Sequence, residues 1–315
     1  MPAVTDAVAP SIGLRIPHEV FESGDAGRLR RLVADVADSG VDRLCVGDHV
    51  SFHGGRGFDG LLQATALAAL CDLEIQTAVY LLPLRHPVPV ARQVASLAQL
   101  AGGGFVFGVG VGGEDPDEVR MCGVDPATRG RRTDESLGIV RALLAGGEVT
   151  HHGDFFGIEG ARILPVPPRA VPVVIGGRSP AALRRAGMLG EGYLAVWLTP
   201  ERFSAAVTEV ETVAERAGRS GVPWRHGLQV WCGFGDDPVS ARALVAAEME
   251  ALYRMPFERF ERYTPAGTPA DVAAALRPYV EAGCGEVNLI AVAATPLESV
   301  RAAAEVRRIL HAVAP

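Results

Sequence analysis

The stretch DAGRLRRLVADVADSGVDRLCVGDH, residues 25–49, contains a helical half and a strand-like half, and this pair sets the pattern of the chain. Between Leu29 and Ala37, apolar residues recur at the spacing of one helix face. Gly40 follows, where a helix end often needs a residue that adopts positive φ. The run 43–47 is short and mostly apolar, as buried strands are. The stretch therefore predicts a helix followed by a buried strand.

The same alternation of strand-like and helical stretches recurs along the chain. The strand-like runs are 12–16, 43–47, 74–80, 105–110, 172–176, 193–198, 228–234 and 286–292. A helical stretch follows each run, which is typical of a parallel sheet. Eight repeats predict an α/β fold, a (β/α)8 TIM barrel, with residues 1–315 forming a single domain. Residues 146–171, after the fourth helix, are rich in glycine and proline. We expect an insertion there, a hairpin plus irregular chain outside the barrel.

Five of the expected helices begin with a capping residue followed by proline. The pairs are Ser179-Pro180, Thr199-Pro200, Asp237-Pro238, Thr268-Pro269 and Thr295-Pro296. The capping side chain accepts hydrogen bonds from free backbone N–H groups, and proline fits the first helical position because it has no N–H to leave unpaired. We therefore expect helices to begin at these five prolines.

The charged residues exclude several classes of protein. The chain has 30 basic and 37 acidic side chains, a formal charge of −7, and every basic residue is arginine. Schiff-base aldolases, pyridoxal-phosphate enzymes and Walker-type phosphate binders all need a lysine amine, so they are excluded. The acidic balance argues against nucleic acid or an anionic membrane as a partner. A bound anion must be held by arginine, backbone N–H groups or hydroxyls.

The cysteines and the N-terminal residues indicate the compartment. Five cysteines are scattered without the spacing of a zinc site, so no metal is expected. An odd number of cysteines without a secretory signal favours reduced thiols. No run approaches the 18 or so uncharged apolar residues of a membrane span. We therefore expect a cytoplasmic protein without a membrane segment.

The ends of the strand-like runs carry the first candidates for chemistry, since the active sites of such barrels lie at the C-terminal ends of the strands. The second run ends in Asp48-His49, a carboxylate beside a group that titrates near neutral pH. This pair is a candidate for acid–base catalysis. A histidine that only caps a carbonyl group is the alternative.

A glycine-rich segment, GVGVGG at 108–113, continues the fourth run and formally matches the dinucleotide-binding fingerprint. The next residues, 114–118, are mostly acidic and would repel a pyrophosphate. We interpret Gly110 and Gly112 instead as positions where the backbone passes close to a flat group. A glycine-rich turn without a ligand is the alternative.

The fifth run ends in Gly176-Gly177-Arg178-Ser179, directly before an expected helix. Exposed N–H groups, the helix dipole and a guanidinium together make a phosphate site that needs no lysine. These four residues are therefore candidates for holding a phosphate. A plain helix cap is the alternative.

Taken in order, these motifs resemble the luciferase-like monooxygenase superfamily, whose members bind a flavin or the deazaflavin coenzyme F420. The matching segments are 46–50, 77–79, 82–87, 107–112, 129–135 and 172–177. The resemblance implies a cofactor with its ring over Ala78, Val79 and Gly110 and its phosphate at the 176–179 loop. It also implies a cis peptide bond between Ala78 and Val79.

The resemblance also suggests residues of the substrate pocket. In the sugar-6-phosphate dehydrogenase branch, a tryptophan lies four positions after the histidine and a glutamate follows the glycine run. In this chain, His53 lies at the position of that tryptophan, and Glu114 lies one residue away from the position of that glutamate. That branch holds its substrate's phosphate with lysines, which this chain lacks, so we expect a different substrate. Trp197 and Trp231, at or near strand ends, are the other candidates for this pocket.

The function implied by the resemblance is that of an F420-dependent oxidoreductase, which passes a hydride between the deazaflavin C5 and a small organic substrate. His49 would donate or accept a proton, and Asp48 would orient it or change its pKa. Two alternatives stay open: a two-component FMN-dependent monooxygenase that uses reduced flavin and oxygen, and a non-catalytic cofactor-binding relative. The family further implies a homodimer and a partner flavin or F420 reductase.

Overall fold

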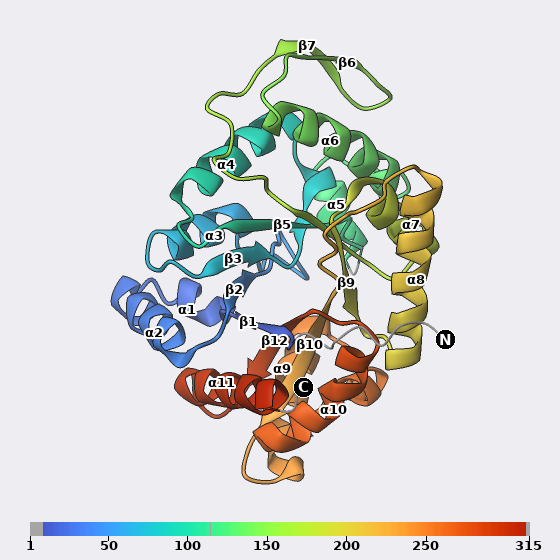
Figure 1. Ribbon diagram of the computed structural model, residues 1–315. Coiled ribbons are helices and arrows are strands. Elements are labelled where there is room, and N and C mark those ends of the chain that lie inside the picture. Colours follow the sequence, from blue (N-terminus) through green and yellow to red (C-terminus); the bar gives the residue numbers. More distant parts are fainter. Residues whose placement is uncertain (1–8, 114, 313–315) are drawn as a thin grey trace.

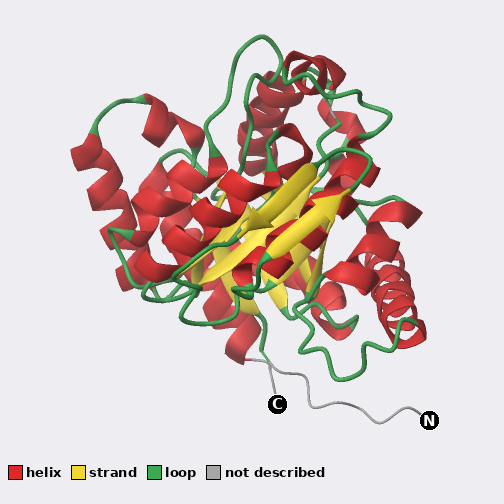
Figure 2. Ribbon diagram, turned by 90° about the horizontal axis from the view of Figure 1, so that it is seen from above, coloured by secondary structure: helices red, strands yellow, loops and turns green. Residues whose placement is uncertain are grey.

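The computed structural model describes residues 9–113 and 115–312. In this part of the chain, eight parallel strands close into a barrel, and β12 pairs with β1 to complete the ring. Figure 2 shows the strands at the centre with helices around them. In ring order the strands are β1 (Ser11–Arg15), β2 (Arg43–Val46), β3 (Glu74–Thr77), β5 (Phe105–Gly110), β8 (Val173–Gly176), β9 (Gly192–Val196), β10 (Gly227–Phe234) and β12 (Glu286–Val292). The prediction of a TIM barrel is confirmed.

The helices surround the barrel (Figure 1). They are α1 (His18–Glu22), α2 (Ala26–Ser39), α3 (Gly60–Ala68), α4 (Pro87–Leu100), α5 (Pro116–Met121), α6 (Arg129–Leu144), α7 (Pro180–Leu189), α8 (Pro200–Arg216), α9 (Pro238–Tyr253), α10 (Pro269–Glu281) and α11 (Pro296–Ala312). The short elements are the strands β4 (Tyr80–Leu81) and β11 (Ala266–Gly267) and the 3-10 turns η1 (Leu82–Leu84), η2 (Phe257–Arg259) and η3 (Glu261–Tyr263). None of the described helices has the length and apolar character needed to cross a lipid bilayer.

The capping residues, prolines and glycine singled out in the sequence begin or end helices where predicted. Helices α7 to α11 begin at the five expected prolines. Ser179, for example, accepts a hydrogen bond from the Ala182 N–H at the start of α7. Helix α2 begins after Asp25, which caps it, and ends at Gly40 with φ of 85°. These ends are set by neighbours in sequence, which is why they could be read from it.

A hairpin lies outside the barrel in the segment predicted as an insertion, at the top of Figure 1. Its strands, β6 (Val149–His152) and β7 (Gly157–Ala161), pair antiparallel. The Glu135 carboxylate on α6 anchors the hairpin, because it accepts hydrogen bonds from the N–H groups of Phe155 and Phe156 and pairs with the His151 imidazole. His151 therefore has a structural partner, and no group of metal-ligating side chains occurs among the described residues.

The N-terminal end of the barrel is filled by buried charges. Arg43, 1% exposed, pairs with Glu286 at 2.7 Å and with Glu74 at 3.1 Å. Arg225 binds the same two carboxylates. Gly13 leaves room for this network, since a Cβ there would lie 2.7 Å from Cγ of Arg43. Because this network fills the N-terminal half of the barrel interior, the larger space for a ligand lies at the C-terminal ends of the strands.

The buried His226, next to β10, gives the protein a specific sensitivity to acid. Burial lowers the pKa of His226 to about 4, whereas an unfolded histidine titrates near 6.5. Its contribution to stability is therefore full above pH 6.5 and is lost as the pH falls toward 4, because only the unfolded chain binds the proton. We expect the free energy of unfolding to fall by about 2 kcal/mol more in the wild type than in His226→Gln between pH 7 and pH 4.5. Denaturant titrations at the two pH values measure this difference, and equal losses in both proteins would contradict it.

Candidate active site

A cavity of about 570 Å³ opens at the C-terminal ends of the barrel strands. This volume is in the range of sites for small molecules and cofactors. Of the predicted residues, those that line it are Asp48, His49, Ala78, Val79, Gly110, Gly112, Gly176, Gly177, Arg178, Ser179 and Trp197. The barrel thus brings together side chains from positions far apart in sequence.

The floor of the cavity is apolar and centres on Val79. The peptide bond between Ala78 and Val79 is cis, as the resemblance implied. The Val79 side chain lies between the ends of β5 and β8. A Cβ on Gly110 would lie 2.3 Å from Cγ2 of Val79, and a Cβ on Gly176 would lie 2.8 Å from Cγ1. Both positions therefore need glycine, and the resulting surface suits a flat ring.

The loop before α7 has the features of an anion site. Gly177 has φ of 137°, and a Cβ there would lie 2.8 Å from that of Ala182. The Arg178 guanidinium lies over the Trp197 ring, 5.0 Å from its centroid, and no described carboxylate lies within ion-pair distance of it. At the start of α7, Pro180 has no N–H and the Ala182 N–H is taken by Ser179, so the features that favour an anion are the Arg178 guanidinium and the positive end of the helix dipole. The positive charge and the helix N-terminus are compatible with the phosphate site expected from the sequence, which stays a prediction.

His49 lies on the cavity wall and is held by Glu118 of α5. The His49 Nδ1–H donates to Oε2 of Glu118 at 3.1 Å, which leaves Nε2 as the nitrogen that can exchange a proton. Oε1 of Glu118 accepts from the N–H groups of Val50 at 2.6 Å and Ser51 at 3.1 Å. Burial alone would raise the pKa of Glu118, but the hydrogen bonds from His49 and the two backbone groups keep it below its usual value. Glu118 is therefore a carboxylate at neutral pH and fixes the imidazole.

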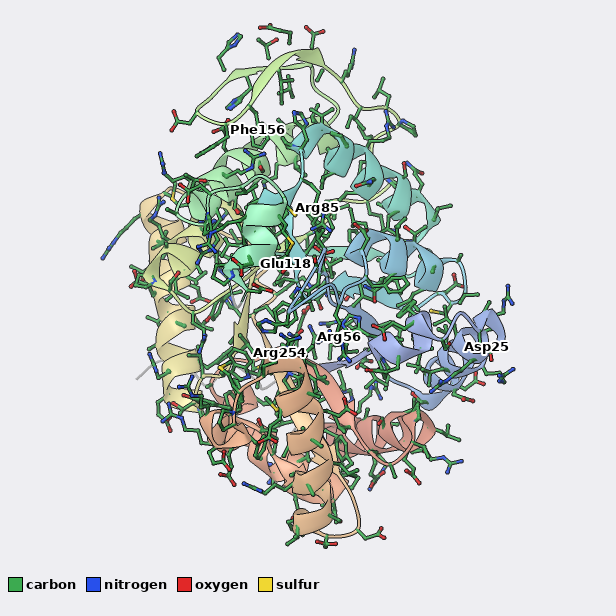
Figure 3. The ribbon with its side chains drawn as sticks, turned by 180° about the vertical axis from the view of Figure 1, so that it is seen from behind. Asp25, Arg56, Arg85, Glu118, Phe156 and Arg254 are labelled. Carbon is green, nitrogen blue, oxygen red and sulfur yellow. The ribbon has the colours of Figure 1, made fainter. Side chains whose placement is uncertain are left out.

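The prediction that Asp48 orients His49 is wrong. The Asp48 carboxylate is 2% exposed and binds Arg85 through both oxygens, at 2.6 and 2.8 Å. It also accepts from the N–H groups of Gly60 and Leu81. His49 binds Glu118 instead, so the two neighbouring side chains have different partners. In Figure 3, Arg85 and Glu118 lie toward the middle of the molecule, whereas Asp25 lies at its edge.

Two residues predicted for the substrate pocket do not line the cavity. His53 is held by Asp115, which accepts from its N–H at 2.7 Å and lies 3.5 Å from its Nδ1. Trp231 is 7% exposed, and its Nε1–H donates to the Tyr253 hydroxyl. Glu114 lies outside the described residues.

Several lining residues were missed by the sequence analysis. Among them are Arg15, Arg129, Gln229, Leu252 and Tyr253. Arg15 is the last residue of β1, so its place at a strand end was a signal that could have found it. Glu118 was noted only as part of an acidic run. Nothing local distinguishes it, because its partner His49 is 69 residues away.

The closed barrel, with a cavity at the C-terminal ends of its strands, defines a TIM-barrel protein of the α/β class. Residues 12–266 match the family model of luciferase-like monooxygenases, and the chain belongs to this family.

Similar proteins include users of F420 and of FMN. An F420-dependent glucose-6-phosphate dehydrogenase of Rhodococcus hoagii is 28% identical, and the match covers 86% of this chain and 89% of that protein. A protein of Mycobacterium tuberculosis named as uncharacterised is 34% identical over 160 residues, which is 51% of this chain and only 55% of that relative's length.

Two solved structures share the fold. The first is an F420-dependent secondary alcohol dehydrogenase in complex with an F420-acetone adduct. Its TM-score is 0.82 at 20% identity, covering 95% of this chain and 98% of that one. The second is the oxygenating constituent of 3,6-diketocamphane monooxygenase of Pseudomonas putida, in complex with FMN. Its TM-score is 0.75 at 19% identity, with 98% of both chains covered.

Proposed function

We propose that this protein is a coenzyme F420-dependent oxidoreductase that catalyses hydride transfer between the deazaflavin C5 and a small organic substrate. The observation that carries the proposal is His49 on the cavity wall, fixed through Nδ1 by a buried carboxylate and with Nε2 left to exchange a proton. Similarity to F420-dependent dehydrogenases supports it. When bound, F420 supplies a carbon that accepts or donates a hydride.

The residues of this chain have distinct tasks in the proposed reaction. Ala78 and Val79 form the apolar surface that supports the ring, with Gly110 beside them. Arg178 and the N-terminus of α7 bind the cofactor's phosphate. His49 donates a proton to the substrate during reduction, or accepts one during oxidation, and Glu118 stabilises the charged imidazole meanwhile. Glu118 is thus a positioning residue.

An FMN-dependent monooxygenase is the second candidate. The anion loop and the apolar floor suit FMN as well as F420, and the FMN complex noted above shares the fold. The proton-exchanging histidine at the cavity wall favours the dehydrogenase. Binding with no turnover over a broad substrate panel would instead support the third candidate, a non-catalytic relative.

Cofactor titration tests the proposal. We expect the purified protein to bind F420 more tightly than FMN, and Arg178→Gln to weaken F420 binding about 10- to 100-fold, because a charge-assisted hydrogen bond to phosphate is lost. Arg184→Gln on the same helix is the control: its side chain is exposed and loosely paired with Asp134, so F420 affinity should not change. Tight binding of FMN without binding of F420 would overturn the proposal.

A further inference from the structure

The Arg15 guanidinium at the end of β1 is a charged group of the cavity with no task in the function above. Arg15 lines the cavity and is half-buried. Gly47 makes room for it, because a Cβ there would lie 2.7 Å from Nη2 of Arg15. Its Nη2 donates a hydrogen bond to Nε2 of His18. The guanidinium is therefore held in a fixed place by its surroundings.

The positive charge of Arg15 has no direct ion-pair partner among the described residues, although Glu19 and Tyr253 interact with it electrostatically. No described carboxylate lies within 4 Å of Arg15. Asp48, which also lines the cavity, is bound to Arg85 through both oxygens. Burial, together with the charges of Arg15 and His49, lowers the pKa of His18 to about 3, so His18 is a neutral acceptor at pH 7. Arg15 has five N–H donors, of which one donates to His18.

The position of Arg15 in the ring separates it from the cofactor's phosphate. Going round the barrel, β1 is followed by β2, β3, β5 and β8. The anion loop after β8 is therefore on the opposite side of the eight-stranded ring. His49, in contrast, follows the strand that pairs directly with β1. An anion bound by Arg15 would lie on the side of the cavity where the proton is exchanged.

We propose that Arg15 binds a carboxylate of the substrate, and that the substrate is a small organic acid. This inference rests on the proposed function and names its substrate class. The planar guanidinium pairs with a carboxylate through two parallel hydrogen bonds. A carboxylate fits better than a phosphate, because the single positive charge of Arg15 matches the single negative charge of a carboxylate. The acid group would place the reacting carbon of the substrate beside His49.

Binding of benzoate and of benzamide to the full chain tests this proposal, because the two probes have nearly the same shape and differ in charge. Titration calorimetry should show benzoate binding at least 10-fold more tightly than benzamide. Arg15→Gln should abolish this preference and leave benzamide binding unchanged, whereas Arg15→Lys should retain part of it. Arg56→Gln, which removes an exposed arginine of the 49–59 loop, should leave the preference intact.

Three outcomes would overturn the proposal: equal affinity for the two probes in the wild type, a benzoate preference that survives in Arg15→Gln, or one that is lost in Arg178→Gln instead. The wild-type comparison needs no variant, so a poorly folding Arg15→Gln protein would not leave the question open. The measurement also needs no cofactor. Benzoate selectivity without F420 binding would refute the cofactor assignment alone, and F420 binding without benzoate selectivity would refute the Arg15 site alone.

Discussion

Replacement of His49 by glutamine is expected to lower turnover by about 10²- to 10⁴-fold, the usual contribution of a general acid or base. Glutamine keeps a similar size and polarity but cannot carry the proton. The affinity for F420 should change little, because the proposed contacts to ring and phosphate come from other residues. The rate is measured from the change in F420 absorbance with a substrate that the wild type accepts. A His49→Gln protein with full turnover would remove His49 from the mechanism.

Substitutions of Glu118 test whether this carboxylate positions the His49 imidazole. Glu118→Ala frees the imidazole to rotate, and we expect kcat to fall about 10-fold with a small change in KM, as for the loss of an orienting carboxylate. Glu118→Gln can still accept the Nδ1–H of His49 and should restore part of the rate. A loss of stability without this rescue would show that Glu118 only holds the loop at Val50 and Ser51.

Replacement of Asp48 by alanine is expected to lower the free energy of unfolding by about 3–5 kcal/mol, which is typical when one partner of a buried ion pair is removed. The change leaves the Arg85 guanidinium without its main partner and leaves the N–H groups of Gly60 and Leu81 unsatisfied. Denaturant-induced unfolding at pH 7 measures the loss.

Two further variants show whether the unpaired charge of Arg85 causes this loss of stability. Asp59→Ala also removes a carboxylate from Arg85, but this pair is more exposed, and we expect a loss of about 1 kcal/mol, mostly from the cap of α3. The double variant Asp48→Ala/Arg85→Ala should be more stable than Asp48→Ala alone, since no unpaired charge remains. A loss below 1 kcal/mol in Asp48→Ala would show that the pair contributes little.

Part of the site could be predicted from residue order, because in a β/α barrel the ends of the strands meet at one mouth. His49, Gly110, Gly176 and Arg178 were found in this way, and all line the cavity. His53 follows β2, but Trp231 lies inside β10 and not at a strand end as predicted, and both side chains bind other partners. A place at a strand end is therefore informative about position and much less so about the direction of a side chain.

The homodimer, the partner reductase and the cytoplasmic location stay predictions. The missing lysines remain an argument against a sugar-phosphate substrate, even though an F420-dependent glucose-6-phosphate dehydrogenase is among the similar proteins. The proposal for Arg15 adds that the anionic group of the substrate is a carboxylate.

The sequence by itself determined the alternation of strands and helices, the helix ends and the glycine-containing loop before α7. These features depend on the period of apolar residues and on caps that act over a few positions, as Asp25 and Gly40 do for α2. Only the tertiary structure decided the partners of the buried charges. Asp48 meets Arg85 37 residues later, and His49 meets Glu118 69 residues later. These pairs form because the closed barrel brings distant strand ends together, and no local pattern encodes which side chains then meet.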